Sequence, residues 1–470
     1  MKQESSKKWH WALALCLIAA LSGTAWAVDS LTYSGSTDNS MLQDLPGWIS
    51  RDVLGDYWTV VSDSLFPTGE TGNTVTINYS AGTDAATVSL DFVGGAQSSD
   101  VDVSKNTIEV KSGWIKSAVI GAITRNKNAM SNDVTISGGT VGSADASLEK
   151  YALYHGDVSG GYVTSGEGYA YDKTVTISGG TIFGAVIGGV VQGPVGDPWH
   201  KTWMTAGTGN AENNKVDIKG GILNNGGLLN NAIFGGYVGG GNAKKNQVNI
   251  SGTPLLTSVD QIVGGYSSAG SALENSVYIG NNVLIGTTLT AGSAAHIIGG
   301  KADGGTMGAI AGNPKSADCN SVIINANITA AGYIYGGFTR SQGTSASNNW
   351  VGLLGGKIEA PESKKLQIFG GWVSKDSAVA KENIVEIAGS TTFGEGVSLY
   401  GWGNAFQNTE HTGNTLILNG VKNITVESVQ SFDRYEFNLP ANVGSGALIS
   451  ADEADLGSEA TFEVSNFPTG

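Results

Sequence analysis

A short motif recurs along most of the chain and restricts the folds that it can adopt. The clearest copy runs from Asn246 to Tyr266: it opens with Asn-Gln-Val-Asn-Ile-Ser-Gly and closes with Ile-Val-Gly-Gly-Tyr. From Val134 to Leu416, the centres of successive copies are 29 to 45 residues apart, a spacing that indicates a repeat architecture. The centres are Val75, Ile108, Val134, Val175, Val216, Val248, Val277, Val322, Val351, Val385 and Leu416.

The opening half of each copy is the pattern of a short, one-sided β-strand. Residues i and i+2 of a strand share a face, so Val248 and Ile250 point to one side and Asn249 to the other. Such a strand is too short to be stable alone, but stacked copies bury their Val and Ile pairs in one continuous core. No helical i, i+3, i+4 periodicity is sustained, and the glycines disfavour helix. We therefore predict an all-β chain folded as a parallel β-helix (β-solenoid).

Two side-chain columns and one recurring corner are expected from this stacking. Asn stands two residues before the strand centre in every copy but one, where Lys173 replaces it, and stacked Asn amides can hydrogen-bond along the axis. The Gly-Gly pairs are interpreted as corners with positive φ. The aromatic residues after them are interpreted as a packing ladder, with an exposed sugar-stacking stripe as the alternative. This aromatic column contains Tyr162, Tyr237, Tyr266, Phe338 and Trp372.

The first residues have the features of a targeting signal. Lys2, Lys7 and Lys8 precede a short apolar run, and Ala25-Trp26-Ala27 is a cleavage motif, so we predict a signal peptide over 1–27 and export through the inner membrane. Cleavage removes three Lys and one Glu, and moves the net charge from −15 to −17. An acidic exported chain disfavours nucleic acid as a partner. Cys319 is then the one remaining cysteine, which leaves no internal disulfide.

The repeats divide the mature chain into three parts. Residues 28–70 are irregular and are expected to form an N-terminal cap on the first coil. Residues 71–420 are the solenoid repeats, and 421–470, where the motif changes, are expected to begin a further, truncated segment. Insertions are expected at 142–157, 191–213, 282–295 and 302–319. Insertions of this kind tend to lie on one face and often carry binding. The loop 193–203, with two Trp, one His and one Lys, is a candidate for ligand contact against an ordinary turn.

A search for catalytic and metal sites gives none, so we predict no enzyme, no cofactor and no metal. His155, His200, His296 and His411 lie in different repeats and match no zinc motif. Cys319 is expected to be half-buried and unreactive. The nearest carboxylate pair is Asp100 and Asp102, and the acidic run Asp452, Glu453 and Asp455 is expected to be a solvated face. The glycine-rich stretch 299–305 lacks the nine-residue period of calcium repeats, and 239–245 lacks the Gly-Lys-Ser/Thr of a phosphate loop.

Three features occur together in this chain: a signal peptide, the repeats Asn-x-Val-x-Ile-Ser-Gly-Gly and Ile/Phe-Gly-Gly-Tyr, and the segment Phe432-Asp433-Arg434-Tyr435-Glu436-Phe437-Asn438-Leu439-Pro440. With these features, the chain resembles the passenger region of autotransporter-type surface proteins of Gram-negative bacteria. The resemblance covers most of the mature chain. It implies a right-handed parallel β-helix exported to the cell surface and anchored by a C-terminal β-barrel. The alternating ten-residue strands of such a barrel are absent from this sequence.

Three functions remain open at this point. The first is a structural stalk or adhesin that attaches to glycans or proteins on host or bacterial surfaces. The second is a polysaccharide lyase or glycosidase, which requires clustered carboxylates in a groove. The third is a secreted matrix protein that self-associates through the ends of the solenoid.

Overall fold

The structure is a computed structural model. It describes residues 31–33, 64–65, 71–78, 89–98, 100–143, 156–164, 166–191, 208–223, 232–256, 259–280, 283–285, 295–303, 315–340, 344–375, 377–404, 409–442, 446–457 and 459–466. The predicted signal peptide, most of the predicted cap, His155, His200 and the loop 193–203 lie outside these residues. Within the described part, no helix is both long and apolar enough to cross a membrane.

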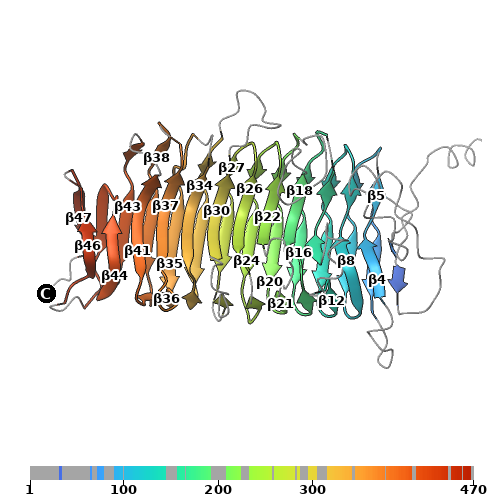
Figure 1. The fold of residues 1–470 in the computed structure, drawn as a ribbon, viewed down its shortest axis with the longest axis horizontal. Helices are drawn as coiled ribbons and strands as arrows, with labels where there is room; N and C mark the ends of the chain where they lie inside the picture. Colours follow the sequence, from blue (N-terminus) through green and yellow to red (C-terminus); the bar gives the residue numbers. More distant parts are fainter. Residues whose placement is uncertain are drawn as a thin grey trace, which may run out of the picture.

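The predicted β-helix is confirmed: parallel strands from successive repeats stack into an elongated body (Figure 1). The eleven strands centred on the repeated motif, together with three others, form a 14-stranded sheet in chain order among the described residues. The strands of this motif sheet are β1 (Leu31–Tyr33), β3 (Thr74–Ile77), β7 (Thr107–Val110), β11 (Asp133–Ile136), β16 (Thr174–Ile177), β20 (Lys215–Ile218), β24 (Gln247–Ile250), β28 (Ser276–Ile279), β32 (Ser321–Asn325), β35 (Trp350–Gly355), β39 (Ile384–Ala388), β43 (Thr415–Asn419), β45 (Arg434–Asn438) and β47 (Thr461–Ser465).

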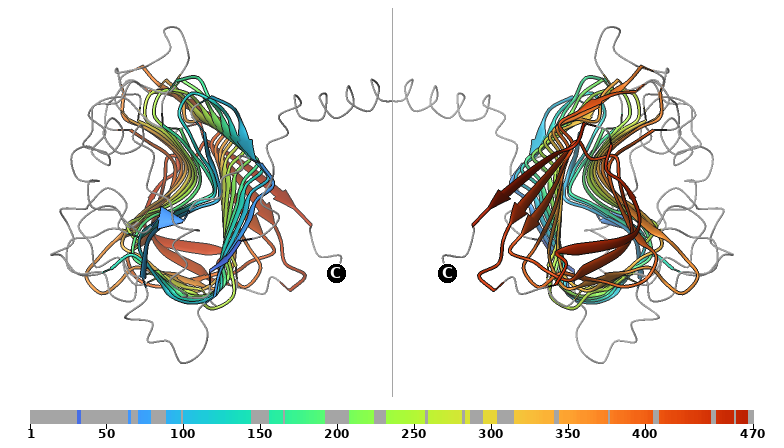
Figure 2. Two further views of the ribbon diagram at one scale, coloured as in Figure 1. Left: turned by 90° about the vertical axis from the view of Figure 1, so that its right-hand side faces the viewer. Right: turned by 90° about the vertical axis from the view of Figure 1, so that its left-hand side faces the viewer.

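A second sheet contains the Gly-Gly segments, and a narrower sheet completes the turn in the coils between residues 103 and 318. Figure 2 shows the coils end-on. The long strands of the second sheet are β18 (Val186–Val191), β22 (Ala232–Val238), β26 (Gln261–Ser267), β30 (Ala295–Ala302), β34 (Gly332–Thr339), β37 (Leu366–Val373) and β41 (Val397–Asn404). The narrower sheet consists of the two-residue strands β6 (Val103–Ser104), β10 (Ala129–Met130), β15 (Ala170–Tyr171), β19 (Ala211–Glu212), β23 (Ala243–Lys244), β27 (Ala272–Leu273) and β31 (Ala317–Asp318).

The interior of the coils is one continuous hydrophobic core. Val248 and Ile250 are fully buried and pair in register with Val277 and Ile279 of the next coil, while Asn249 between them is only half-buried. The same alternation repeats along the motif sheet. Because burying a Val or Ile side chain contributes about 1.5–3 kcal/mol, each coil is stabilised chiefly by this pair and its neighbours.

The predicted asparagine ladder is present inside the stack. In eight links, an amide Nδ2 donates to the Oδ1 of the next coil's asparagine over 2.8 to 3.2 Å. The same Oδ1 accepts the backbone N–H of the donor residue, as for Asn246 and Asn275. The links run Asn73–Asn106–Asn132 and, after Lys173, Asn214–Asn246–Asn275–Asn320–Asn349–Asn383–Asn414.

The interpretation of the Gly-Gly pairs as corners is wrong. In the pairs that precede the aromatic position, neither glycine has a positive φ. These pairs lie inside the long strands, except Gly160-Gly161, which lies between the short strands β13 (Asp157–Ser159) and β14 (Tyr162–Val163). Their missing side chains make room for the ladder: a Cβ on Gly265 would lie 2.2 Å from Asn275 Oδ1, and one on Gly337 would lie 2.3 Å from the Ala317 carbonyl oxygen.

The left-handed corner is instead the residue just before each ladder position. Its φ lies between 50° and 57° where it is not glycine, and is 78° at Gly72 and 71° at Gly413. This strained turn recurs in each coil of the ladder and aims the following asparagine inward. The non-glycine residues that adopt it are Lys105, Ser131, Asp172, Asn213, Lys245, Glu274, Cys319, Asn348 and Glu382.

Lys173 replaces asparagine in the ladder and is fully buried. Its ammonium donates to the carbonyl oxygens of Ala129 and Tyr171. Desolvation holds the pKa of Lys173 well below its usual value, against an opposing effect of Asp172. Asn214 Oδ1, the acceptor that the missing amide would have used, is buried without a hydrogen-bond partner.

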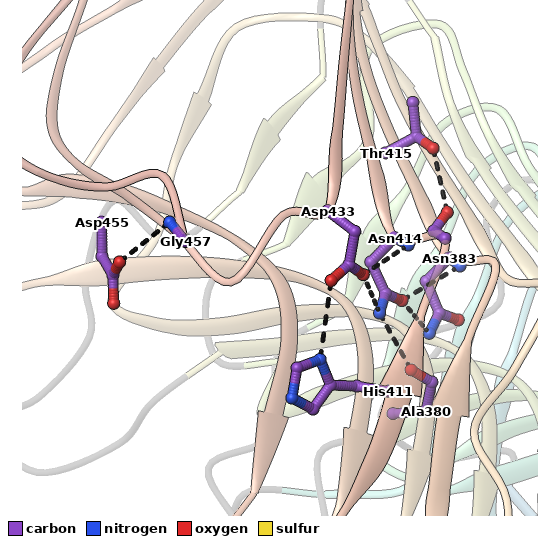
Figure 3. Close-up of polar contacts among 9 residues, drawn as sticks. Ala380, Asn383, His411, Asn414, Thr415, Asp433, Asp455 and Gly457 are labelled. Carbon is purple, nitrogen blue, oxygen red and sulfur yellow. Dashed lines mark hydrogen bonds and ion pairs between the residues drawn. The ribbon is translucent and has the colours of Figure 1, made fainter. Parts of the chain in front are cut away.

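Coils continue beyond residue 420, where the motif changes. Strands β44 (Ile424–Gln430) and β45 pair with β41 and β43, and β46 (Ile449–Asp455) and β47 pair with them in turn. Asp433 then takes the ladder position: its Oδ2 accepts the backbone N–H and the Nδ2 of Asn414, at 2.9 and 3.1 Å (Figure 3).

Candidate binding face on the outside of the solenoid

The long strands carry a second hydrophobic cluster on the face opposite the core. Adjacent residues of a strand point to opposite faces. Accordingly, Ile233 of β22 packs in the core and Phe234 in the separate cluster. In β34, Ile334 and Tyr335 divide in the same way. We call this cluster the outer aromatic face. Its aromatic members are Tyr162, Phe234, Tyr237, Tyr266, Tyr333, Tyr335, Phe338, Phe369, Trp372 and Tyr400.

The Gly-Gly pair bends each long strand and brings two columns of this face together. The ring before the pair and the ring after it are three residues apart, yet they touch. Tyr335 and Phe338 have ring centroids 5.0 Å apart, and Phe369 and Trp372 meet edge-on at 5.0 Å. The end-on views show these strands bent rather than flat (Figure 2). The glycines therefore serve both the ladder inside and the aromatic contacts outside.

The predicted aromatic column is confirmed as a column, although Val190 and Lys301 interrupt it. In its first half it is a packing ladder, since Tyr237 and Tyr266 are buried and stack at 4.8 Å. Toward the C-terminus, Phe338 and Trp372 are half-buried. The face thus changes along the axis from a covered ladder to an accessible one.

The accessible half includes a neighbouring column that the sequence analysis missed. Tyr400 is half-buried and stacks on Phe369 at 4.5 Å, and Tyr333, also half-buried, stacks on Tyr335 at 5.4 Å. Gln367 lies beside them and donates from Nε2 to the Tyr400 hydroxyl at 3.3 Å. Burial raises the pKa of Tyr335 far above its usual value, so this phenol remains neutral at physiological pH.

Strand β30 adds charged groups to the face. Lys301 takes the aromatic position between Tyr266 and Phe338, and its Nζ lies 5.2 Å from the centroid of the Tyr266 ring. Nζ donates to Gln261 Oε1 at 3.3 Å and lies 3.9 Å from Asp303 Oδ1. Burial lowers the pKa of Lys301, Asp303 opposes this shift, and Arg340 adds to it.

His296 belongs to the same strand and faces the aromatic surface. Its ring stacks on Tyr333 at 5.4 Å, and its Nδ1 is buried without a hydrogen-bond partner. Burial lowers the pKa of His296, and the charge of Lys301 lowers it further. At neutral pH the ring is therefore uncharged. Burial also raises the pKa of Asp260, whose carbonyl oxygen accepts the His296 backbone N–H at 2.8 Å.

The other sequence candidates lie apart from this face or have structural roles. His411 stacks on Trp402 at 4.2 Å, and its Nδ1 lies 3.6 Å from Asp433 (Figure 3). Asp102 accepts the backbone N–H of Asn128 in a neighbouring turn.

Two further predictions for single residues have different outcomes. The prediction that Cys319 is half-buried is wrong: it is exposed, because it occupies the left-handed corner. The acidic run 452–455 is confirmed as a solvated surface of β46. In the described part of the chain, no three His, Cys, Asp or Glu side chains are grouped as a metal site would require.

The outer aromatic face combines aromatic rings, on which a ligand can stack, with hydrogen-bonding groups at their border. This arrangement suits the binding of a ligand. Comparison with models of protein families, with curated proteins and with solved structures gave no match to this chain.

Proposed function

We propose that the chain is an exported surface β-helix of the autotransporter-passenger type, which acts as a stiff adhesin and binds glycans on its outer aromatic face. In this proposal the chain carries out no catalysis. The observation that supports it best is a group of half-buried rings toward the C-terminal end of the face. Phe338 and Trp372 follow one another in one column, and Tyr333 and Tyr400 lie in two other columns of the same strands.

The spacing of the rings suits an extended sugar chain. Neighbouring coils of a parallel stack are roughly 4.8 Å apart, which is about the length of one hexose unit. Aromatic rings offer broad apolar surfaces that pack against the C–H face of a sugar, and few χ angles have to be ordered on binding. Gln367 and the groups on β30 then supply hydrogen bonds at the border of the face.

The predicted signal peptide over 1–27 supports export, and the repeated motif supports display at the cell surface. Stacked coils with a continuous core and an internal amide ladder make a rigid rod, which holds a binding face away from the membrane. The anchor in this proposal is an outer-membrane barrel, either as part of a longer chain or as a separate protein.

The test uses the mature chain from residue 28 and a panel of immobilised polysaccharides, both neutral and acidic. Trp372→Ala and Tyr400→Ala should each weaken binding at least about tenfold, which corresponds to ~1.4 kcal/mol. Tyr278→Ala is the matched control, because Tyr278 is 36% exposed but lies on the motif sheet. Equal binding by all three variants would refute this site.

The same preparation separates the other two functions. Shortened polysaccharide products after incubation would favour the lyase or glycosidase. A mass that rises with protein concentration in sedimentation equilibrium, without glycan binding, would favour the self-associating matrix protein.

A further inference from the structure

We propose that Lys301 and Asp303 form a subsite for the hydroxyl groups of a neutral sugar, so that the outer aromatic face selects neutral rather than acidic glycans. This inference rests on the proposed function. It concerns the edge of the accessible rings, where one coil carries charged groups in the aromatic column.

The subsite adjoins the accessible part of the face. Strand β30 pairs in register with β34, which sets His296 beside Tyr333 and Lys301 beside Phe338. A sugar chain that stacks on Phe338 and Trp372 along the axis therefore reaches Lys301 one coil earlier. Lys301 and Asp303 keep 15% and 23% of their side-chain surface exposed, although the Oδ1 atom of Asp303 is itself buried.

The two charged groups are separated by a gap that one hydroxyl oxygen can bridge. The 3.9 Å between Lys301 Nζ and Asp303 Oδ1 is too long for a hydrogen bond. Asp303 Oδ2 accepts the Tyr266 hydroxyl at 2.8 Å, whereas Oδ1 is buried and has no hydrogen-bond partner among the described residues. Nζ donates to Gln261 and has further protons to offer. A hydroxyl that accepts from Nζ and donates to Oδ1 satisfies both groups.

His296 provides a second acceptor on the same strand. Its Nδ1 has no partner within the described structure, and its ring is held against Tyr333. Another hydroxyl of the sugar can donate to this nitrogen. Burial lowers the pKa of His296, which keeps the ring in the neutral form that accepts a hydrogen bond.

The charge balance favours a neutral ligand. Asp303 already compensates Lys301, so a carboxylate that approached Lys301 would also approach the carboxylate of Asp303. The chain as a whole carries a net charge of −15, which repels polyanions at low salt. A polyhydroxylated neutral sugar keeps the Lys301–Asp303 pair intact and completes its hydrogen bonds.

The test measures the affinity of the mature chain for neutral oligosaccharides and for uronate oligomers of matched length, by calorimetry at two salt concentrations. We expect neutral oligosaccharides to bind more tightly, and Lys301→Met and Asp303→Asn each to lower that affinity by about tenfold or more. The double variant should be little worse than either single one, because both groups serve one hydroxyl. Lys357→Met is the control, since Lys357 forms an exposed ion pair with Glu359.

A ligand-side measurement keeps the test valid if a variant fails to fold. Neutral oligosaccharides deoxygenated at single positions should include one that binds the unaltered chain about tenfold more weakly. If uronate oligomers bind better, or if every deoxy sugar binds as well as its parent, the subsite is refuted. Loss of binding by Trp372→Ala would then still uphold the glycan-binding face. Binding of no sugar at all would refute the proposed function itself.

Discussion

Replacing Lys173 with asparagine should repair the one break in the ladder between Asn73 and Asn414, and the gain in stability should depend on pH. An asparagine at this position can accept from Asn132 and donate to Asn214 Oδ1, which is now unsatisfied. It can also donate to the Ala129 carbonyl, as Asn246 does to the Ala211 carbonyl of the preceding coil. The two new ladder links contribute about 2 kcal/mol at roughly 1 kcal/mol each.

Two other effects act in opposite directions. Shortening lysine to asparagine removes three buried methylenes, a loss of about 2.4 kcal/mol at ~0.8 kcal/mol each, which offsets the ladder links. The remaining difference in stability between wild type and variant is the cost of burying the Lys173 amine, because desolvation lowers its pKa. The unfolded chain binds a proton at Lys173 up to a pH of about 10.4. The folded chain releases this proton at a lower pH. The wild-type free energy of unfolding is therefore greatest above a pH of about 10.4, and it falls as the pH decreases toward the folded pKa.

The assay is urea unfolding of the mature chain and of Lys173→Asn between pH 7 and pH 10. Between the two pKa values, the wild-type free energy of unfolding should rise by about 1.36 kcal/mol per pH unit relative to the variant. The variant should therefore be more stable at pH 7, and its advantage should shrink as the pH rises. Lys173→Met, which keeps the apolar stem, should lose the pH dependence without joining the ladder. Parallel pH profiles for wild type and Lys173→Asn would refute the reasoning.

Three further predictions follow from the interior of the coil. Asn320→Ala removes the hydrogen bonds to Asn275, Asn349 and the Ala272 carbonyl, and should lower the free energy of unfolding by about 3 kcal/mol in urea; a loss below ~1 kcal/mol would contradict a stabilising ladder. Gly337→Ala places a Cβ 2.5 Å from Asn349 Nδ2, so we expect a loss of at least about 3 kcal/mol or failure to fold, read by circular dichroism. Ser131→Gly should raise the free energy of unfolding by about 0.5–1 kcal/mol, and with it the melting temperature, because the φ of 50° at Ser131 strains a non-glycine residue. Ser131→Val should lower the melting temperature. Equal melting temperatures for the three proteins would show that this corner is unstrained.

The fold could be predicted because the ladder asparagine has few alternatives at its position. A buried amide between stacked backbones needs both a donor and an acceptor, and asparagine provides both within a short side chain, so it recurs visibly. The left-handed corner could not be predicted. It is filled by residues as different as Lys105, Glu274 and Cys319, because their side chains point outward and only the backbone is constrained.

The Gly-Gly pairs were misinterpreted for a related reason. Absence of a side chain fits either a positive φ or a close approach of another group, and the sequence does not show which neighbour comes close. The outer aromatic face was found only in part for the same kind of reason. In Ile-Phe-Gly-Gly and Ile-Tyr-Gly-Gly both residues before the glycines are apolar, so hydrophobicity alone does not tell which one leaves the core.

The asparagine ladder also gives the solenoid a dipole along its axis. From Asn214 to Asn414, each Nδ2 donates to the ladder side chain of the next coil, so the amide dipoles point the same way and add, as peptide dipoles do in a helix. The positive end of this array meets the carboxylate of Asp433, an anion placed where a helix would place one. A coil added in the reverse sense would set donor against donor. The ladder therefore permits growth of the stack in one polarity, and the carboxylate marks the coil at which this array ends.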